Sequence, residues 1–285
     1  MSGRLYIVST PIGNLGDITA RALETLRTAD VIAAEDTRRT AALLSAYDIH
    51  GSLISFHEHS SRAKAEELLR RLLSGESIAI VTDAGTPIIS DPGEVLTKLA
   101  ADNGIEIVSV PGACAAISAL TVSAIDASRF TFQGFLPRDK TRSERISEVV
   151  RSELTSVLYE SPHHLSRTLS ELAQLIPNRS ISVCKELTKL HEEVLRGPAV
   201  QLAEELRARG EVKGEIALVI APPSEDEEAG IVPVGAAAAD PDEALREDIR
   251  AALEEGEPAS AVAKRLSQKY SRRKRDVYAM VLDMQ

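Results

Sequence analysis

The 285-residue sequence contains no tryptophan, and only 3% of its residues are aromatic. Extended stacking of bases on aromatic platforms is therefore not expected as its main mode of recognition. No run approaches the roughly 18 apolar residues that suggest a membrane span. The first residues also lack the apolar core of a signal peptide, because Pro11 and Gly13 interrupt the one short hydrophobic run. We therefore expect a cytoplasmic protein with no membrane contact.

Cysteine is also scarce. Cys114 and Cys184 lie far apart in the chain and have neither metal-binding nor redox spacing, so we expect two reduced thiols. His57 and His59 flank Glu58, but no cysteine or third histidine lies nearby at a ligand spacing. No metal site is expected. The sequence also has no Walker phosphate loop and no G-x-G-x-x-G after its first expected strand, which gives no support for a nucleotide triphosphatase or an ordinary dinucleotide enzyme.

Charge is distributed unevenly. The formal net charge is -10, yet residues 259–285 carry seven Lys or Arg against two Asp, which is +5 net and leaves -15 on residues 1–258. Such asymmetry suggests a polyanion-binding tail on an acidic body, and a solvated helix end is the alternative. The candidate phosphate contacts in this tail are Arg272, Arg273, Lys274 and Arg275.

Short β-branched runs alternate with segments of helical period, which predicts βαβ units and mainly parallel sheets. In one helical segment, Ala65, Leu68, Leu69 and Leu72 fall on a single face. The first half has expected strands at 5–8, 31–34, 53–56, 78–81 and 105–110. A second, similar series has expected strands at 130–134, 157–159, 181–184 and 216–220, with helices around 144–153, 165–175 and 200–209.

Four regions follow from this pattern. We expect an N-terminal α/β domain at 1–125 and a second α/β domain at 126–221. Residues 222–242 are rich in Ala, Pro, Glu and Asp without periodicity, which is typical of an acidic flexible linker. Residues 243–285 are expected to form a small helical, basic RNA-binding domain.

Unusual residues collect directly after the expected strands of the first half. Ligands of open α/β sheets bind outside the carboxyl ends of the strands, so these loops are expected to line one cleft. The five loops are Ser9–Asn14, Glu35–Arg38, His57–His59, Thr82–Pro87 and Pro111–Cys114.

The segment Asp83–Gly93 is the most informative of these. Gly85 allows close backbone approach, Pro87 and Pro92 stiffen the loop, and Ser90 or Asp91 could cap a helix starting near Gly93. A structural turn is one interpretation, and a rigid loop offering backbone groups to an adenosine or methionine moiety is the other. The small residues after Pro111 similarly suit either a ligand at a helix N-terminus or tight helix–sheet packing.

Glu35, Asp36 and Arg38 fall within four residues at a strand end. A solvated turn or local ion pair is the ordinary interpretation of such a group. The functional alternative assigns Arg38 to an RNA phosphate and one carboxylate to orienting or deprotonating a hydroxyl.

Taken in order over about residues 4–221, several phrases together resemble the tetrapyrrole methylase family, and within it the branch that methylates ribosomal RNA. They include STPIGNLGDIT, AEDTR, SFHEH, TDAGTPIISDPG, VPGACA, GFLPR, YESPHH and KELTKLHEE. TDAGTPIISDPG is long and unusual, and hence specific. The first and fourth loops differ from the Gly-Pro-Gly-Asp and Gly-Asp-Pro forms of the relatives that methylate corrin precursors, which favours an RNA substrate.

The resemblance implies two αβα domains with S-adenosylmethionine in a cleft between them, a small helical C-terminal domain, and a homodimer. It also implies 2'-O-methylation of a cytidine ribose in the decoding region of 16S rRNA, in free RNA or in the small ribosomal subunit. Glu35 and Asp36 become the catalytic candidates, with Arg38 and His57 as substrate contacts beside the basic tail. The implied donor-binding residues are Pro11, Ile12, Asp83, Gly85, Thr86, Ile89, Cys114, Ala115, Tyr159, Ala217 and Pro222.

Two other functions remain open from the residues themselves. A C-methyltransferase for tetrapyrrole or corrin precursors would share the fold without needing a basic tail. A non-enzymatic RNA-binding ribosome-assembly factor would keep the tail without needing a donor pocket.

Overall fold

A computed structural model describes residues 2–57, 60–210, 212–224, 246, 249–250, 252–253, 257–269 and 274–284. The chain divides into two units, Met1–Pro223 and Ser224–Gln285. The expected acidic linker lies outside the described residues from 225 onward. Within the described part of the chain, no helix is both long and apolar enough to cross a bilayer.

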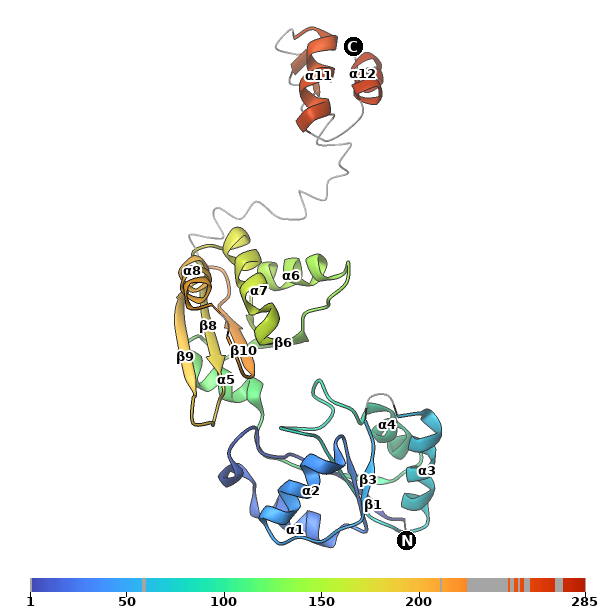
Figure 1. Cartoon of the computed structure of the whole chain (residues 1–285). Coiled ribbons are helices and arrows are strands. Elements are labelled where there is room, and N and C mark those ends of the chain that lie inside the picture. Colours follow the sequence, from blue (N-terminus) through green and yellow to red (C-terminus); the bar gives the residue numbers. More distant parts are fainter. Residues whose placement is uncertain are drawn as a thin grey trace. The chain divides into compact units, whose positions relative to one another are not determined.

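The first unit begins with a five-stranded parallel sheet in the order β3-β2-β4-β1-β5. Figure 1 labels β1 and β3 of this sheet. Its strands are β1 (Arg4–Val8), β2 (Val31–Ala34), β3 (Leu53–Ser55), β4 (Ile78–Val81) and β5 (Glu106–Val110). Its helices are α1 (Ala20–Thr28), α2 (Thr37–Ala46), α3 (Arg62–Leu73) and α4 (Glu94–Asp102), with a short 3₁₀ turn at Leu15–Asp17.

The sheet is buried on both faces because successive side chains of a strand point to opposite sides. In β4, Ile78 and Ile80 join the core that α3 and α4 cover, whereas Ala79 and Val81 join the core beneath α1 and α2. The face predicted for α3 is confirmed, since all four of its apolar residues are buried there.

The second sheet is mixed rather than mainly parallel, in the order β6-β7-β10-β8-β9. Only β6 and β7 pair in parallel; β10 is antiparallel to both β7 and β8, and β9 is antiparallel to β8. Its strands are β6 (Phe130–Phe135), β7 (Thr155–Glu160), β8 (Ser180–Lys185), β9 (Glu193–Pro198) and β10 (Ile216–Ile220). Strand β9 was not predicted, because its EVLRGP sequence has no apolar alternation and ends in Gly-Pro.

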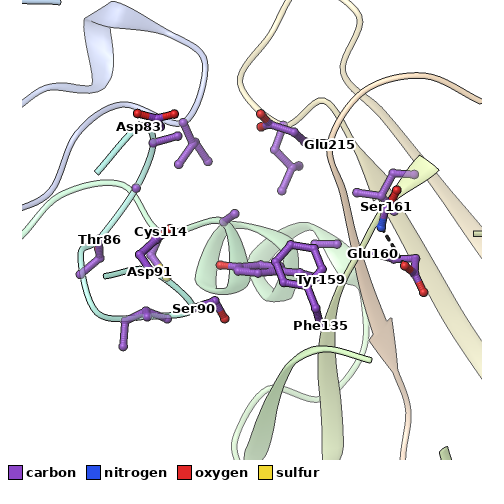
Figure 2. Close-up of a pocket in the computed structure, with 18 of the residues that line it drawn as sticks. Asp83, Thr86, Ser90, Asp91, Cys114, Phe135, Tyr159, Glu160, Ser161 and Glu215 are labelled. Atoms are coloured by element: carbon purple, nitrogen blue, oxygen red, sulfur yellow. Dashed lines mark hydrogen bonds between the residues drawn. The ribbon is translucent and has the colours of Figure 1, made fainter. Parts of the chain in front are cut away.

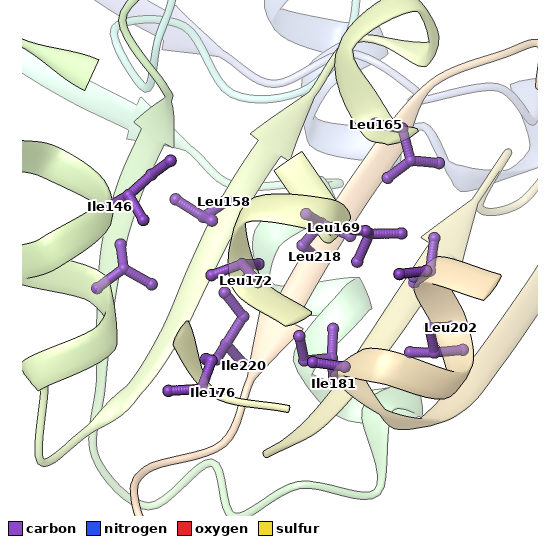
Figure 3. Close-up of a cluster of buried hydrophobic side chains, with 14 of the residues drawn as sticks. Ile146, Leu158, Leu165, Leu169, Leu172, Ile176, Ile181, Leu202, Leu218 and Ile220 are labelled. Carbon is purple, nitrogen blue, oxygen red and sulfur yellow. The ribbon is translucent and has the colours of Figure 1, made fainter. Parts of the chain in front are cut away.

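Helices cover both faces of this sheet. In β10, Ile216, Leu218 and Ile220 pack beneath α6 (Arg142–Arg151), α7 (Pro162–Leu175) and α8 (Ala199–Arg209), the cluster drawn in Figure 3. Ala217 and Val219 point to the other face. The expected pair of αβα layers is therefore confirmed.

Helix α5 (Ala115–Ser123) covers that other face, although it follows directly on the last strand of the first sheet. Its Ala116, Ala119 and Leu120 share a core with Val157 of β7 and Val219 of β10. The segment 115–123, which the sequence places in the first domain, thus packs as a layer of the second sheet.

The second unit contains α11 (Ala259–Lys269) and α12 (Lys274–Asp283), which pack together through Val262, Leu266 and Val277. Helical character is therefore confirmed for this region. Lys274 and Arg275 open α12, whereas Arg272 and Arg273 lie outside the described residues.

Candidate active site

Loops from both sheets of the first unit line one cavity of about 340 Å³, which is within the usual range for small-molecule sites. Figure 2 shows Asp83, Thr86, Asp91 and Cys114 facing Tyr159, Phe135 and Glu215 across it. The full lining is Ile12, Glu35, Arg39, Asp83, Ala84, Gly85, Thr86, Ile89, Ser90, Asp91, Cys114, Ala115, Phe135, Tyr159, Glu160, Ser161, Pro162, Cys184, Leu187, Gly214, Glu215, Ile216 and Ala217.

Three loops of the first sheet are tied together beside this cavity. Thr10 and Gly85 exchange two backbone hydrogen bonds, of 2.9 and 3.1 Å. The hydroxyls of Ser9 and Thr86 lie 2.9 Å apart, and Thr86 also donates to the Ala113 carbonyl oxygen at 3.1 Å. The wall is held by hydrogen bonds between loops that are distant in sequence, so it is preorganised.

The loops that follow the neighbouring strands β2 and β4 are joined by two reciprocal hydrogen bonds. The Asp83 amide donates to the Glu35 carboxylate at 3.2 Å, and the Asp36 amide donates to the Asp83 carboxylate at 3.1 Å. Arg39 adds an ion pair with Asp83 at 3.3 Å. Glu35 and Asp83 therefore hold the two loops together and also contribute negative charge to the cavity.

Asp91 also lines the cavity, although the sequence interpretation did not assign it to the site. Ser90 or Asp91 was expected to cap α4, but Gly93 is the N-cap and α4 has no side-chain cap hydrogen bond. Among the residues that the structure describes, none donates a hydrogen bond to the Asp91 carboxylate. Burial, together with the nearby Glu35 and Asp83 carboxylates, raises the pKa of Asp91 to about 7.

Asp36 and Arg38 form an ion pair with each other. Asp36 is the N-cap of α2 and accepts a hydrogen bond from the Arg38 amide at 2.8 Å. The Arg38 guanidinium, whose side chain is 89% exposed, donates to the same carboxylate at 2.7 Å. This pairing and the backbone hydrogen bond hold the pKa of Asp36 below its usual range, which makes it a weak base. The local ion pair, which was the ordinary interpretation of this group from the sequence, is present.

The opposite wall is centred on Tyr159. Its hydroxyl oxygen accepts a hydrogen bond from the Ala116 amide at the start of α5, at 3.1 Å. Burial and the adjacent Cys114 raise the pKa of Tyr159 to about 12, so the phenol stays neutral. Tyr159 thus joins the two halves of the site without adding charge.

A buried polar network supports the same wall from behind. The Glu160 carboxylate accepts hydrogen bonds from the Ser161 amide at 2.7 Å and from the Thr168 hydroxyl at 2.5 Å. The Arg142 guanidinium donates to the Thr168 hydroxyl at 2.7 Å and pairs with Glu171 at 3.0 Å. Glu160 and Arg142 are each 6% exposed and Thr168 is fully buried, so every member depends on its partner.

We expect Thr168→Val to destabilise the protein by about 1–3 kcal/mol, because it removes the hydroxyl that links the two buried charges. Thr168→Ser keeps that hydroxyl and is expected to cost much less. Denaturant unfolding of the two variants checks this difference. Equal stabilities would show that the network contributes little.

The start of β10 reaches the cavity because this strand runs antiparallel to β7 and β8. Ile216 pairs with Glu160, at the carboxyl end of β7, whereas Ile220 pairs with Ser156 near its beginning. Glu215 therefore lies at the cavity, where Lys189 pairs with it at 3.1 Å. Pro222, which the family resemblance implies as a donor-binding residue, follows the opposite end of β10 and is not among the lining residues.

Nine of the eleven implied donor-binding residues line the cavity, and Pro11 joins Pro222 outside its lining. Of the other candidates in this unit, Glu35 lines it, whereas Asp36, Arg38 and His57 do not. The sequence interpretation did not assign Arg39, Phe135 and Glu160 to the site, although they line the cavity. Arg39 lies in the first turn of α2, and Phe135 and Glu160 are the last residues of β6 and β7, so a search of strand ends and helix starts in both sheets could have found them. Among described residues, no cluster of His, Cys, Asp or Glu suits a metal ion.

The cavity is suited to a cationic ligand with an apolar body. Ile12, Ala115 and Ala217 contribute apolar surface to the lining, and Glu35, Asp83 and Asp91 contribute carboxylates. Gly85 leaves open the space beside Ile12 and Ala113 that a side chain would occupy. An acidic cavity next to tightly linked strand-end loops of two sheets is typical of an enzyme that binds a small positively charged molecule.

Residues 4–203 match the family described as Tetrapyrrole (Corrin/Porphyrin) Methylases. The chain belongs to this family and is a methyltransferase.

Two curated proteins that bear the name ribosomal RNA small subunit methyltransferase I are similar to the chain. The protein from Synechocystis sp. is 39% identical over 285 residues, which covers 99% of each chain. The protein from Thermotoga maritima is 44% identical over 218 residues, which covers 76% of this chain and 98% of the relative.

Solved structures confirm the fold. Uroporphyrin-III C-methyltransferase from Thermus thermophilus, in complex with S-adenosylhomocysteine, aligns with a TM-score of 0.55 and 16% identity, over 77% of this chain and 97% of that one.

Proposed function

We propose that this methyltransferase uses S-adenosylmethionine to methylate the 2'-oxygen of a cytidine ribose in the decoding region of 16S rRNA. The observation that best supports this proposal is the acidic, preorganised cavity. The chain that forms it is 39% identical, over 99% of its length, to a protein named as a small-subunit rRNA methyltransferase. A corrin-type substrate has less support, because that C-methyltransferase structure is only 16% identical. An assembly factor would have no need of this cavity.

The cavity fits the donor in charge and in size. S-adenosylmethionine, when bound, supplies a methyl group activated by a positively charged sulfur. Glu35, Asp83 and Asp91 place negative charge beside this cation, and the apolar residues Ile12, Ala115 and Ala217 receive its uncharged parts. Nine of the residues implied by the family resemblance remain our candidates for this binding.

We assign proton removal to Asp91 rather than to Glu35 or Asp36. Asp36 is committed to Arg38 and the start of α2, and Glu35 accepts the Asp83 amide. Asp91 lines the cavity and accepts no hydrogen bond from any residue that the structure describes, and its pKa of about 7 is matched to taking a proton at neutral pH. As the 2'-oxygen forms its bond to the methyl carbon, the sulfur–methyl bond breaks with its electron pair left on sulfur, and the hydroxyl proton passes to the Asp91 carboxylate.

The rRNA is proposed to contact cations outside the cavity. Arg38 stays a candidate for a phosphate contact, and Arg39, which is 67% exposed and paired to Asp83, lies at the cavity itself. His57, Arg272, Arg273, Lys274 and Arg275 complete the proposed substrate contacts. A homodimer in the cytoplasm is part of the same proposal.

The test combines a cellular and a purified assay. Mass mapping of ribose methylation in 16S rRNA, with and without the gene, is expected to show one cytidine that loses its methyl group. Purified enzyme with labelled donor is expected to modify small subunits or free 16S rRNA at the same nucleotide. A base methyl, or labelling of a tetrapyrrole instead, would contradict the proposal.

Removing residues 224–285 is expected to weaken RNA binding and to flatten its dependence on salt, because fewer counterions are released. Methyl transfer at saturating RNA should persist, since 98% of the Thermotoga relative is matched by only 76% of this chain. Affinity measured at several salt concentrations checks this. Identical salt slopes for both proteins would exclude a role for the basic tail.

A further inference from the structure

Phe135 is an exposed aromatic residue at the cavity. It is one of only four phenylalanines, and 57% of it is exposed even though it lines the cavity. Figure 2 shows it beside Tyr159, on the side of the cavity opposite Cys114. An exposed ring in a chain so poor in aromatic residues calls for a physical reason.

A β-bulge puts Phe135 on this face. Phe132 pairs with Val157, and after the bulge Phe135 pairs with Tyr159, so three residues of β6 span two of β7. In a regular strand, residues three apart point to opposite faces. The extra residue restores Phe135 to the face of Phe132, as bulges near active sites characteristically re-aim side chains.

Neighbouring groups fix the ring at this position. Phe132 meets Tyr159 edge-on with ring centres 5.0 Å apart, and Phe135 lies tilted at 5.6 Å from the same tyrosine. Gly134 has φ +61°, and a Cβ there would lie 3.1 Å from the Ser90 hydroxyl oxygen. The bulge, the aromatic contact and the close approach of the Ser90 loop all position a ring that remains largely exposed.

The exposure of Phe135 separates it from the buried part of the cavity. Ile12, Cys184 and Ala217 are at most 6% exposed and form the apolar interior, where a small donor is enclosed. Phe135 and Ile89, at 57% and 42%, form the outer edge. A macromolecular acceptor arrives at this edge, because it is too large to enter.

We propose that Phe135 stacks on the base of the nucleotide whose ribose is methylated. The inference rests on the proposed function, and it adds the class of contact: a nucleotide turned out of its strand with its base against one ring. RNA bases freed from a helix are bound in this way by aromatic side chains. Low aromatic content excludes an extended platform, but one ring suffices for one nucleotide.

The test compares Phe135→Ala with Phe130→Ala. Phe130 begins the same strand and is 39% exposed, but it does not line the cavity, so it is a matched control. We expect Phe135→Ala to lower kcat/KM for small-subunit RNA about 5- to 150-fold, the range for one lost base stack. Phe135→Tyr should retain most activity, and Phe130→Ala should match the wild type.

Calorimetry with S-adenosylmethionine decides between the two possible partners of the ring. Donor affinity within about twofold of wild type in Phe135→Ala supports the stack on RNA. An equal loss of donor affinity and of kcat/KM assigns the ring to the donor and overturns the proposal, as does unchanged kcat/KM. Failure of the proposed function is distinguishable, because the wild-type enzyme would then not methylate RNA at all.

Discussion

Asp91→Asn is expected to lower kcat about 10²- to 10⁴-fold, the usual contribution of a general base. The amide keeps the shape of the side chain but cannot accept the proton. Donor binding, measured by calorimetry, should persist because Glu35 and Asp83 still supply negative charge. Asp102→Asn, at the exposed far end of α4 where Asp102 pairs with Lys98 at 4.0 Å, is the control and should behave as wild type.

The same residue predicts a pH profile. Asp91 acts only when deprotonated, and its pKa is raised to about 7 by burial and by the two neighbouring carboxylates. Therefore kcat/KM should rise about tenfold per pH unit below pH 7 and level off above it. A profile that is flat from pH 5 to 8 would remove Asp91 from this role.

Stability gives an independent measurement of the same pKa. The folded state holds the Asp91 proton up to about pH 7, whereas an unfolded aspartate releases it near pH 4, about its reference value. Between these values the folded state binds the additional proton, so the Asp91 contribution to stability falls as pH rises. As the pH increases from 4 to 7, the melting temperature of Asp91→Asn should therefore rise relative to that of the wild type. A constant difference would contradict the raised pKa.

Gly85→Ala is expected to weaken donor binding at least about tenfold, or ~1.4 kcal/mol. The new methyl group would point into space at the cavity, 3.4 Å from the Ile12 side chain and 3.8 Å from the Ala113 carbonyl oxygen. Gly85 also has φ +84°, which an alanine adopts at a cost of about 1–2 kcal/mol. Isothermal calorimetry with S-adenosylmethionine measures the loss.

Gly104→Ala separates these two effects. Gly104 has φ +69°, but a Cβ there meets nothing within 4 Å. Both variants should lose similar stability to backbone strain, and only Gly85→Ala should lose donor affinity. A comparable loss of affinity in both would mean that strain, rather than occupied space, is responsible.

The sequence was most informative where one strand follows another in parallel. The first-sheet strands lie within one residue of their expected ends, because β-branched runs bounded by turn residues mark them clearly. Parallel order also brings successive loops to one edge, and the resulting cavity contains Ile12, Asp83 and Cys114 together.

The second sheet was less predictable, because the alternation of apolar residues along a strand does not indicate whether the strand runs parallel or antiparallel to its neighbours. An antiparallel β10 has the same alternation as a parallel one, yet it replaces Pro222 at the cavity with Glu215. Helix α5 has no clear division between an apolar and a polar face, so its sequence does not indicate which sheet it covers. The raised pKa of Asp91 depends on burial and on Glu35, which is distant in sequence, as well as on Asp83 in the same loop, so no local pattern could reveal it.

Helix α5 has a mechanical consequence for ligand exchange. It continues from the first sheet but is buried against the second, and Ile12 of the first loop joins the same core as Leu120 and Val219. Separating the two sheets would expose that core to water, at a free-energy cost of about 25 cal/mol per Å² of apolar surface. Opening of the two sheets like a hinge is therefore unfavourable. We expect the donor and its demethylated product to exchange through the outer edge of the cavity, before RNA binds there or after it has left.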